Sequence, residues 1–225
     1  MLTILLGISL ILIISACGDK EAEKENQEMQ QVEITDEELI DEKEVIATVN
    51  GVEILGRDYN PAYRERKELE NFNTDPNEEI DTDKVKEITI DGLVGQELIN
   101  QETKELGIDV PEEEIEKELD ILKEQQGDMI DSLLEQFNWT EEDLKNQIRN
   151  DLTNNRYINE KIKVDVTDEE VKAEYDRVKK ESEKVPEFDE VKENIEVQMI
   201  KQKQNEELFK HIEKIKEKSE VNVKI

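Results

Sequence analysis

A β-hairpin is predicted by residues 45–54, Val45-Ile46-Ala47-Thr48-Val49-Asn50-Gly51-Val52-Glu53-Ile54. Its two apolar, mostly β-branched halves flank Asn50-Gly51, a residue pair that favours a tight two-residue turn. Residues 221–225, Val221-Asn222-Val223-Lys224-Ile225, also alternate between apolar and polar side chains. Because an isolated hairpin is only marginally stable in water, we expect this segment to pair with the hairpin and to bring the two ends of the domain together.

Helical patterns dominate the sequence between these two β segments. Apolar residues recur there every three or four positions, which gives each helix a single apolar side that can face a core. The pattern predicts helices that end near Gly107, Gly127 and Ile162, a short helix over 129–137, and a long last helix over 188–215. The chain is therefore expected to be mainly α-helical, with a small β-hairpin completed by the C-terminal strand.

Expected helix starts share a pattern in which Thr is followed by three acidic residues and flanked by apolar ones. It occurs at residues 34–39, 139–144 and 166–171, and Pro111 takes the place of Thr in residues 110–115. The Thr hydroxyl can accept a hydrogen bond from an early backbone N–H, while the third acidic residue reaches back to the Thr backbone. We interpret the pattern as helix capping and not as an internal structural repeat.

The composition limits the possible functions. The chain has 225 residues, of which 61 are Asp or Glu and 30 are Lys or Arg, for a net charge of −31. Such a charge repels phosphates, so we expect no nucleic-acid partner and no binding to anionic lipid surfaces by charge. One Cys and one His argue against a disulfide framework, a multi-ligand metal centre and a His-based catalytic triad. We therefore expect neither a metal nor another cofactor.

The N-terminus has the pattern of a targeting segment. Residues 1–16 are almost wholly apolar, with the length of a secretory hydrophobic region and too few residues to span a bilayer comfortably. Ile14-Ser15-Ala16-Cys17 then resembles the bacterial lipobox, which implies cleavage before Cys17 and attachment of acyl chains such as palmitate to it. An uncleaved signal anchor is the alternative, and no Lys or Arg precedes the apolar run, where a signal peptide normally has one.

The lipobox divides the chain into three expected parts. Residues 1–16 would be a lipoprotein signal peptide, residues 17–43 a lipid-anchored acidic tether, and residues 44–225 the folded domain. The segment directly after Cys17 is polar and charged, and such a segment buries too little apolar area to fold. The protein is thus expected on the extracytoplasmic face of the cell membrane, held by the lipid on Cys17.

The folded part resembles the SurA/PrsA chaperone module, in the form of a SurA N-terminal-like domain of a bacterial lipoprotein. The resemblance rests on the hairpin at 45–54, on residues 164–176, and on a closing helix that ends in a short strand. It implies a helical domain with a small hairpin, in a membrane-tethered extracytoplasmic protein that binds unfolded or newly exported polypeptides. One departure is Leu55, where the family usually has a Ser or Thr cap, and Pro61 is expected to delay or kink the helix that follows.

A second departure concerns catalysis. PrsA-type proteins carry a parvulin prolyl-isomerase domain before the last helix, but the interval from Lys179 to Phe188 is far too short for a domain. The one His, His211, lies within the last helix and not in a parvulin signature. The resemblance therefore implies a chaperone or holdase that is not an enzyme. A prolyl-isomerase foldase, and a surface lipoprotein that docks one dedicated partner, are the alternatives.

An apolar cluster before the helix that starts near Thr140 is the candidate peptide-binding site. A holdase needs partly uncovered apolar side chains, and Met adapts to varied shapes. The alternative is ordinary core packing, with Trp139 against Leu144, because periodic apolar residues are usually buried. The candidate residues are Met129, Leu133, Leu134, Phe137 and Trp139.

Overall fold

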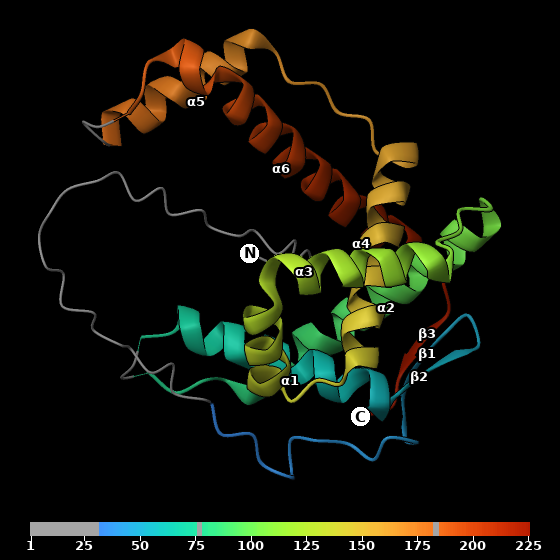
Figure 1. Ribbon diagram of the computed structural model, residues 1–225. Coiled ribbons are helices and arrows are strands. Elements are labelled where there is room, and N and C mark those ends of the chain that lie inside the picture. The colour runs from blue at the N-terminus through green and yellow to red at the C-terminus, as the bar shows by residue number, and fades with distance from the viewer. Residues whose placement is uncertain (1–31, 76–77, 182–184) are drawn as a thin grey trace, which may run out of the picture.

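The computed structural model describes residues 32–75, 78–181 and 185–225, and it is mainly α-helical with one small antiparallel sheet (Figure 1). The expected fold class is thereby confirmed. The lipobox and Cys17 lie outside the described residues. None of the helices in the described ranges has the length and apolarity that crossing a membrane requires. The elements, in chain order, are β1 (Val45–Val49), β2 (Val52–Leu55), α1 (Gly56–Asn73), α2 (Thr82–Glu105), α3 (Glu112–Phe137), α4 (Glu141–Lys161), α5 (Asp168–Glu181), α6 (Phe188–Lys216) and β3 (Val221–Val223).

The sheet has the strand order β2-β1-β3, and both strand pairs are antiparallel. Asn50 and Gly51 form the turn between β1 and β2 with φ angles of 50° and 84°. A tight hairpin turn needs such positive values, and Asn-Gly adopts them readily. On the other edge of β1, Val49 pairs with Val221 and Ala47 with Val223 of β3. The hairpin and its completion by the C-terminal strand are both confirmed.

The main core lies between the sheet, α1, α2, α4 and the end of α6. Tyr59 and Tyr63 of α1 are buried there with their ring centroids 5.3 Å apart. Gly95 allows α2 to approach α6 closely, because a Cβ at this position would lie 3.3 Å from a methyl carbon of Ile212. Each large apolar side chain buried here contributes about 1.5–3 kcal/mol. The other members include Ile46, Ala47, Val49, Val85, Val94, Leu98, Tyr157 and Leu208.

A second apolar cluster joins α3 to α4. α3 is interrupted at Gln126, whose φ of −141° and ψ of 29° are not helical. This interruption lies next to Gly127, where the sequence pattern predicts one helix to end and another to begin. Figure 1 shows the two halves of α3 running in different directions, which lets both pack against α4. The buried members of this cluster are Ile115, Leu119, Ile130, Leu144 and Ile148.

α5 and α6 pack against each other and extend away from the sheet (Figure 1). The ring of Tyr175 lies 5.2 Å from that of Phe188, and its hydroxyl donates to the carbonyl oxygen of Pro186 at 3.0 Å. The C-terminal part of α6 reaches the main core through the buried side chains of Leu208 and Ile212. α6 therefore connects the α5–α6 pair to the body of the domain.

Residues 34–39 form a turn, so the prediction that a helix starts there was wrong. The capping contacts are present, because the backbone N–H and hydroxyl of Thr35 both donate to the Glu38 carboxylate at 3.0 Å. The chain leaves the helical path after Glu38, where Ile40 exchanges two hydrogen bonds with the side chain of Asn60 in α1. A tertiary contact thus replaces the first helical turn.

The segment 32–43 packs against α1, so the folded structure begins before residue 44, where the sequence analysis placed its boundary. Lys67 of α1 forms an ion pair with Glu38 at 2.5 Å and donates to the carbonyl oxygen of Glu33 at 2.7 Å. Ile34 and Ile40 pack against the main core. The tether was inferred from average polarity, which gives too little weight to two apolar side chains in an acidic segment. The expected tether over residues 17–31 lies outside the described residues.

α1 begins at Gly56 and continues through Pro61, so Pro61 does not delay the helix. Leu55 precedes the helix and has no side-chain acceptor, but the carboxylate of Asp58 accepts a hydrogen bond from its backbone N–H at 3.0 Å. Pro61 lies in the second turn and removes one backbone donor there. This local cost is outweighed by the burial of Tyr59 and Tyr63 on the same helix.

Candidate functional site

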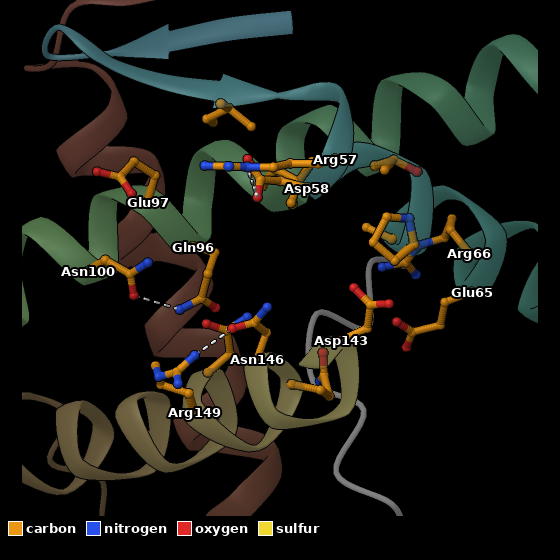
Figure 2. A pocket seen from close by; sticks show the side chains of 18 of the residues that line it. Arg57, Asp58, Glu65, Arg66, Gln96, Glu97, Asn100, Asp143, Asn146 and Arg149 are labelled. Atoms are coloured by element: carbon orange, nitrogen blue, oxygen red, sulfur yellow. Dashed lines mark hydrogen bonds and ion pairs between the residues drawn. The ribbon is translucent and has the colours of Figure 1, made fainter. Parts of the chain in front are cut away.

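A cavity of about 470 Å³ lies between β2, α1, α2 and α4 (Figure 2). We call it the groove, and its lining comprises Glu53 and Ile54, α1 residues between 57 and 66, α2 residues between 88 and 100, Trp139, and α4 residues between 143 and 154. Its volume lies within the range of about 300–1,000 Å³ that is typical of ligand sites. The groove is therefore the candidate binding site of the described structure.

One side of the groove is apolar. β2 contributes Ile54, α1 contributes Pro61 and Ala62, and α2 contributes Leu93. Trp139 precedes α4 and lies beside α1, where its indole N–H donates to the carbonyl oxygen of Pro61 at 3.2 Å. Its ring centroid lies 5.3 Å from that of Phe137. An aromatic ring with a satisfied polar atom is thus fixed at the border of the groove.

Residues spaced three and four apart put a polar side of α4 into the groove. The helix starts at Thr140, whose hydroxyl accepts from the Asp143 N–H at 3.2 Å while the Asp143 carboxylate accepts from the Thr140 N–H at 2.7 Å. The apolar side of the same helix buries Leu144 and Ile148 against α3. The groove side carries Asp143, Asn146, Gln147, Arg149, Asn150, Asp151 and Asn154.

Side-chain amides connect α2 to α4 within the groove. Gln96 donates to Asn154 at 3.4 Å, and Asn154 donates back to Gln96 at 3.0 Å. Gln96 also donates to Asn100 at 3.0 Å, so it is held from two directions (Figure 2). Asn154 is 5% exposed, and burying an amide is costly unless it is hydrogen-bonded. The network therefore fixes the polar floor of the groove.

Two carboxyl groups in the groove have raised pKa values. Burial raises the pKa of Glu65 to about 7, against the lowering effect of Arg66 and with a further contribution from the charge of Asp151. Burial likewise raises the pKa of Asp151 to about 6, opposed by a hydrogen bond from Gln147. Figure 2 shows Glu65 and Arg66 of α1 on the same side of the groove as Asp143. The charge of the groove therefore changes close to neutral pH.

The candidate apolar cluster from the sequence analysis is divided between two environments. Met129 is 47% exposed on α3, whereas Leu133 and Leu134 pack against the second apolar cluster. Phe137 is partly buried beside Trp139, and of the five residues Trp139 is the one that lines the groove. The structure thus brings Phe137 and Trp139 together near the groove, and the role of all five in binding peptides stays a prediction.

Sequence reasoning missed the polar residues of the groove. It concentrated on apolar side chains, because a chaperone surface is expected to be apolar. The available signal was the spacing of Asn146, Asn150 and Asn154, which recur every four residues, and of Gln96 and Asn100, which do the same. Residues four apart lie on one side of a helix, so these amides could have been assigned to two shared surfaces.

Comparisons with known proteins identify a family and several relatives of this chain. The family model of the SurA-like N-terminal domain matches residues 32–158, which include all groove residues. The chain is 34% identical over 146 residues to the foldase protein PrsA of Caldanaerobacter subterraneus, a match over 60% of this chain and 43% of that protein. It is 30% identical over 151 residues to the foldase protein PrsA of Clostridium perfringens, a match over 62% and 44%. The foldase protein PrsA 2 of Bacillus cereus is 37% identical over 84 residues, or 37% of this chain and 26% of that protein.

The matched region thus spans less than half the length of these relatives. The region matched by the family model, residues 32–158, contains the hairpin, α1 to α3 and most of α4, which together build the groove. Since the family model covers more than half of the 225 residues, the chain belongs to the family of the SurA-like N-terminal domain.

Proposed function

We propose that this protein is a chaperone that holds unfolded or newly exported polypeptides in the groove, without catalysing a reaction. The observation that carries the proposal is the groove itself, a cavity of about 470 Å³ with an apolar wall next to two polar helix sides. The names of the relatives, foldase proteins, support a role in protein folding. The family model of the SurA-like N-terminal domain covers the part of the chain that forms the groove.

The lining of the groove suits weak and reversible binding of many sequences. Ile54, Pro61 and Trp139 offer apolar contacts without a deep pocket for one particular side chain. Phe137 lies partly exposed beside Trp139 at the border of the groove, and Met129 on α3 is 47% exposed. With a net charge of −31, the protein would stay soluble when loaded and would favour basic clients over acidic ones.

We expect no prolyl isomerisation, and the short connection between α5 and α6 supports this part of the proposal. α5 ends at Glu181 and α6 begins at Phe188, so the connection is much too short for an inserted domain. The Nε2 atom of His211 lies 3.2 Å from the Glu102 carboxylate, which also accepts a hydrogen bond from Tyr157. This supports a structural role for His211 in joining α6 to α2 and α4.

Lipid anchoring is a second part of the proposal. The segment Ile14-Ser15-Ala16-Cys17 supports acylation of Cys17, which would hold the groove on the extracytoplasmic face of the membrane. Two acyl chains hold far better than one, since each buried CH₂ contributes about 0.8 kcal/mol. Replacement of Cys17 by Ser should move the protein from the membrane fraction to the soluble fraction of expressing cells. An unchanged membrane fraction would contradict the anchor.

The holdase function is tested by mixing the purified full chain with a chemically unfolded model protein and following light scattering. We expect aggregation to be suppressed at a several-fold molar excess of the chain, and cis/trans exchange of a proline-containing peptide to proceed at its uncatalysed rate. Unchanged aggregation would contradict the holdase, and accelerated exchange would favour the isomerase alternative.

A further inference from the structure

The amide side chains of the groove form rows on the two helices that face each other across it. α2 contributes Gln96 and Asn100, and α4 contributes Asn146, Asn150 and Asn154. Figure 2 shows Gln96 extending from α2 toward Asn146 on α4. A primary amide carries two donors and an acceptor oxygen with two lone pairs, which matches the N–H and C=O groups of a polypeptide main chain.

The spacing of the α4 row fits an extended polypeptide. Residues four apart on a helix are separated by about 6 Å along its axis. An extended chain advances about 3.3 Å per residue, so its groups on one edge recur about every 6.6 Å. The step from Asn146 to Asn150 therefore covers about 6 Å, against about 6.6 Å for the matching step of an extended chain.

Part of this hydrogen-bonding capacity is unused in the described structure. The side chain of Asn150 lines the groove, is partly buried, and makes no hydrogen bond with any residue of the described ranges. Asn154 is 5% exposed and exchanges two hydrogen bonds with Gln96, and the side-chain oxygen of Asn146 accepts a hydrogen bond from Arg149. Asn150 is therefore the member of the α4 row whose amide is open to a ligand. Buried polar groups normally have hydrogen-bond partners. The partly buried amide of Asn150 is therefore suited to form a hydrogen bond with a ligand.

We propose that the groove binds an extended polypeptide segment through its main chain, with Asn150 pairing with a backbone N–H or C=O group and Asn146 donating to the next backbone C=O group on the same edge. This inference rests on the proposed chaperone function and specifies that the groove recognises the main chain of its client. Side chains of an extended chain alternate between its two faces, so every second side chain can face Ile54, Pro61 and Trp139. The backbone N–H and C=O groups along one edge can then face the amides. Main-chain recognition gives affinity without sequence specificity, as in the addition of a peptide strand to a sheet edge.

The test compares a labelled unstructured peptide with the same peptide carrying N-methyl groups at alternate residues, using fluorescence anisotropy and the full chain. N-methylation removes backbone donors and leaves the side chains in place. We expect it to weaken binding at least about fivefold, since hydrogen bonds to several amides are lost together. A peptide with the same composition in scrambled order should bind with comparable affinity.

Protein variants give the complementary comparison. Asn150→Ala should weaken binding of the unmodified peptide by a factor of about two to ten, as expected for one hydrogen bond. The matched control is Asn155→Ala, which changes the same residue type on an exposed position of α4 outside the groove and should leave binding unchanged. If N-methylation and Asn150→Ala have no effect while the peptide still binds, main-chain recognition is overturned and the chaperone function stands. If no peptide binds at all, both are overturned.

Discussion

The indole N–H of Trp139 donates to the carbonyl oxygen of Pro61 at 3.2 Å. This hydrogen bond ties the junction between α3 and α4 to the second turn of α1, across one border of the groove. Asn138, which adopts a left-handed conformation with φ of 50°, ends α3 and turns the chain into this position. The apolar border of the groove is therefore held in place by a directional contact as well as by packing.

Replacing Trp139 with Phe should keep an aromatic ring at the groove and remove the hydrogen bond to Pro61. We expect the free energy of unfolding to fall by about 0.5–1.5 kcal/mol, the usual net value of one hydrogen bond, and client binding to weaken. Urea unfolding and the aggregation assay measure the two effects. The control is Phe72→Leu, because Phe72 is 81% exposed and lies outside the groove. A Trp139→Phe variant that binds clients like the parent would show that this contact does not shape the site.

Replacing Lys67 with Met should destabilise the domain strongly. The side chains of Lys67 and Glu38 are 7% and 14% exposed in their ion pair, and Tyr63 donates to the same carboxylate at 2.6 Å. Removing one partner of a buried pair costs about 3–5 kcal/mol, because the remaining charge loses its compensation. Denaturant unfolding should show this loss, whereas Lys210→Met, in a pair with side chains 58% and 47% exposed, should change stability by less than about 1 kcal/mol. Similar losses in both variants would contradict a structural role for residues 32–43.

Adding a methyl group at Gly56 should displace the segment before the hairpin. A Cβ there would lie 2.1 Å from the carbonyl oxygen of Asp41, which is far inside van der Waals contact. We therefore expect Gly56→Ala to lower the thermal midpoint. Gly92→Ala is the matched control, since a Cβ at that helical position meets nothing within 4 Å and Ala stabilises a helix interior by about 0.5–1 kcal/mol. We expect the thermal midpoint to fall in Gly56→Ala and to rise in Gly92→Ala. A higher midpoint in Gly56→Ala would refute the close contact.

The free energy of unfolding should fall as pH rises from about 4 to about 7, because two carboxyl groups of the groove lose their protons in this range. Burial raises the pKa of Glu65 from 4.5 to about 7 and that of Asp151 from 3.8 to about 6. In this range the native state holds protons that the unfolded state has released, so raising the pH favours unfolding. Urea unfolding at several pH values should show a flatter dependence in a Glu65→Gln/Asp151→Asn variant. A slope identical to that of the parent would contradict the raised pKa values.

At lower pH the sign of the dependence should reverse because of Glu38. Burial tends to raise its pKa, but hydrogen bonds from Lys67 and Tyr63 outweigh this and lower the pKa from 4.5 to about 2. The unfolded state then binds the proton more readily, so stability is lost as pH falls from about 4.5 toward 2. A Glu38→Gln variant should be less stable at neutral pH and should lose less stability in acid than the parent. Equal acid sensitivity would argue against the Lys67 contact.

Local signals in the sequence were sufficient for much of the fold. Asn50-Gly51 predicted the hairpin turn because few other pairs adopt two positive φ angles easily. The Thr140 pattern predicted the start of α4, and Gly127 marked the interruption of α3 one residue after Gln126. These features depend on residues close in sequence, so they can be predicted from the sequence alone.

Contacts between distant residues were not predictable in the same way. The turn at residues 34–39 has the capping residues of a helix, but hydrogen bonds between Ile40 and Asn60 decide its conformation. The groove likewise depends on how α2 and α4 face each other, which the apolar pattern of each helix leaves open. Trp139 was identified as a candidate because it is aromatic, whereas Asn150 was not, since an isolated Asn on a helix is usually solvent-exposed.

The most direct test uses the fluorescence of Trp139, the one tryptophan of the chain. A tryptophan-free unfolded polypeptide is titrated into the full chain, and the emission of Trp139 is recorded. If clients bind in the groove, the emission maximum of Trp139 should shift in a saturable manner. An unchanged emission, in samples where the chain nevertheless suppresses aggregation, would show that clients bind elsewhere and would contradict the account.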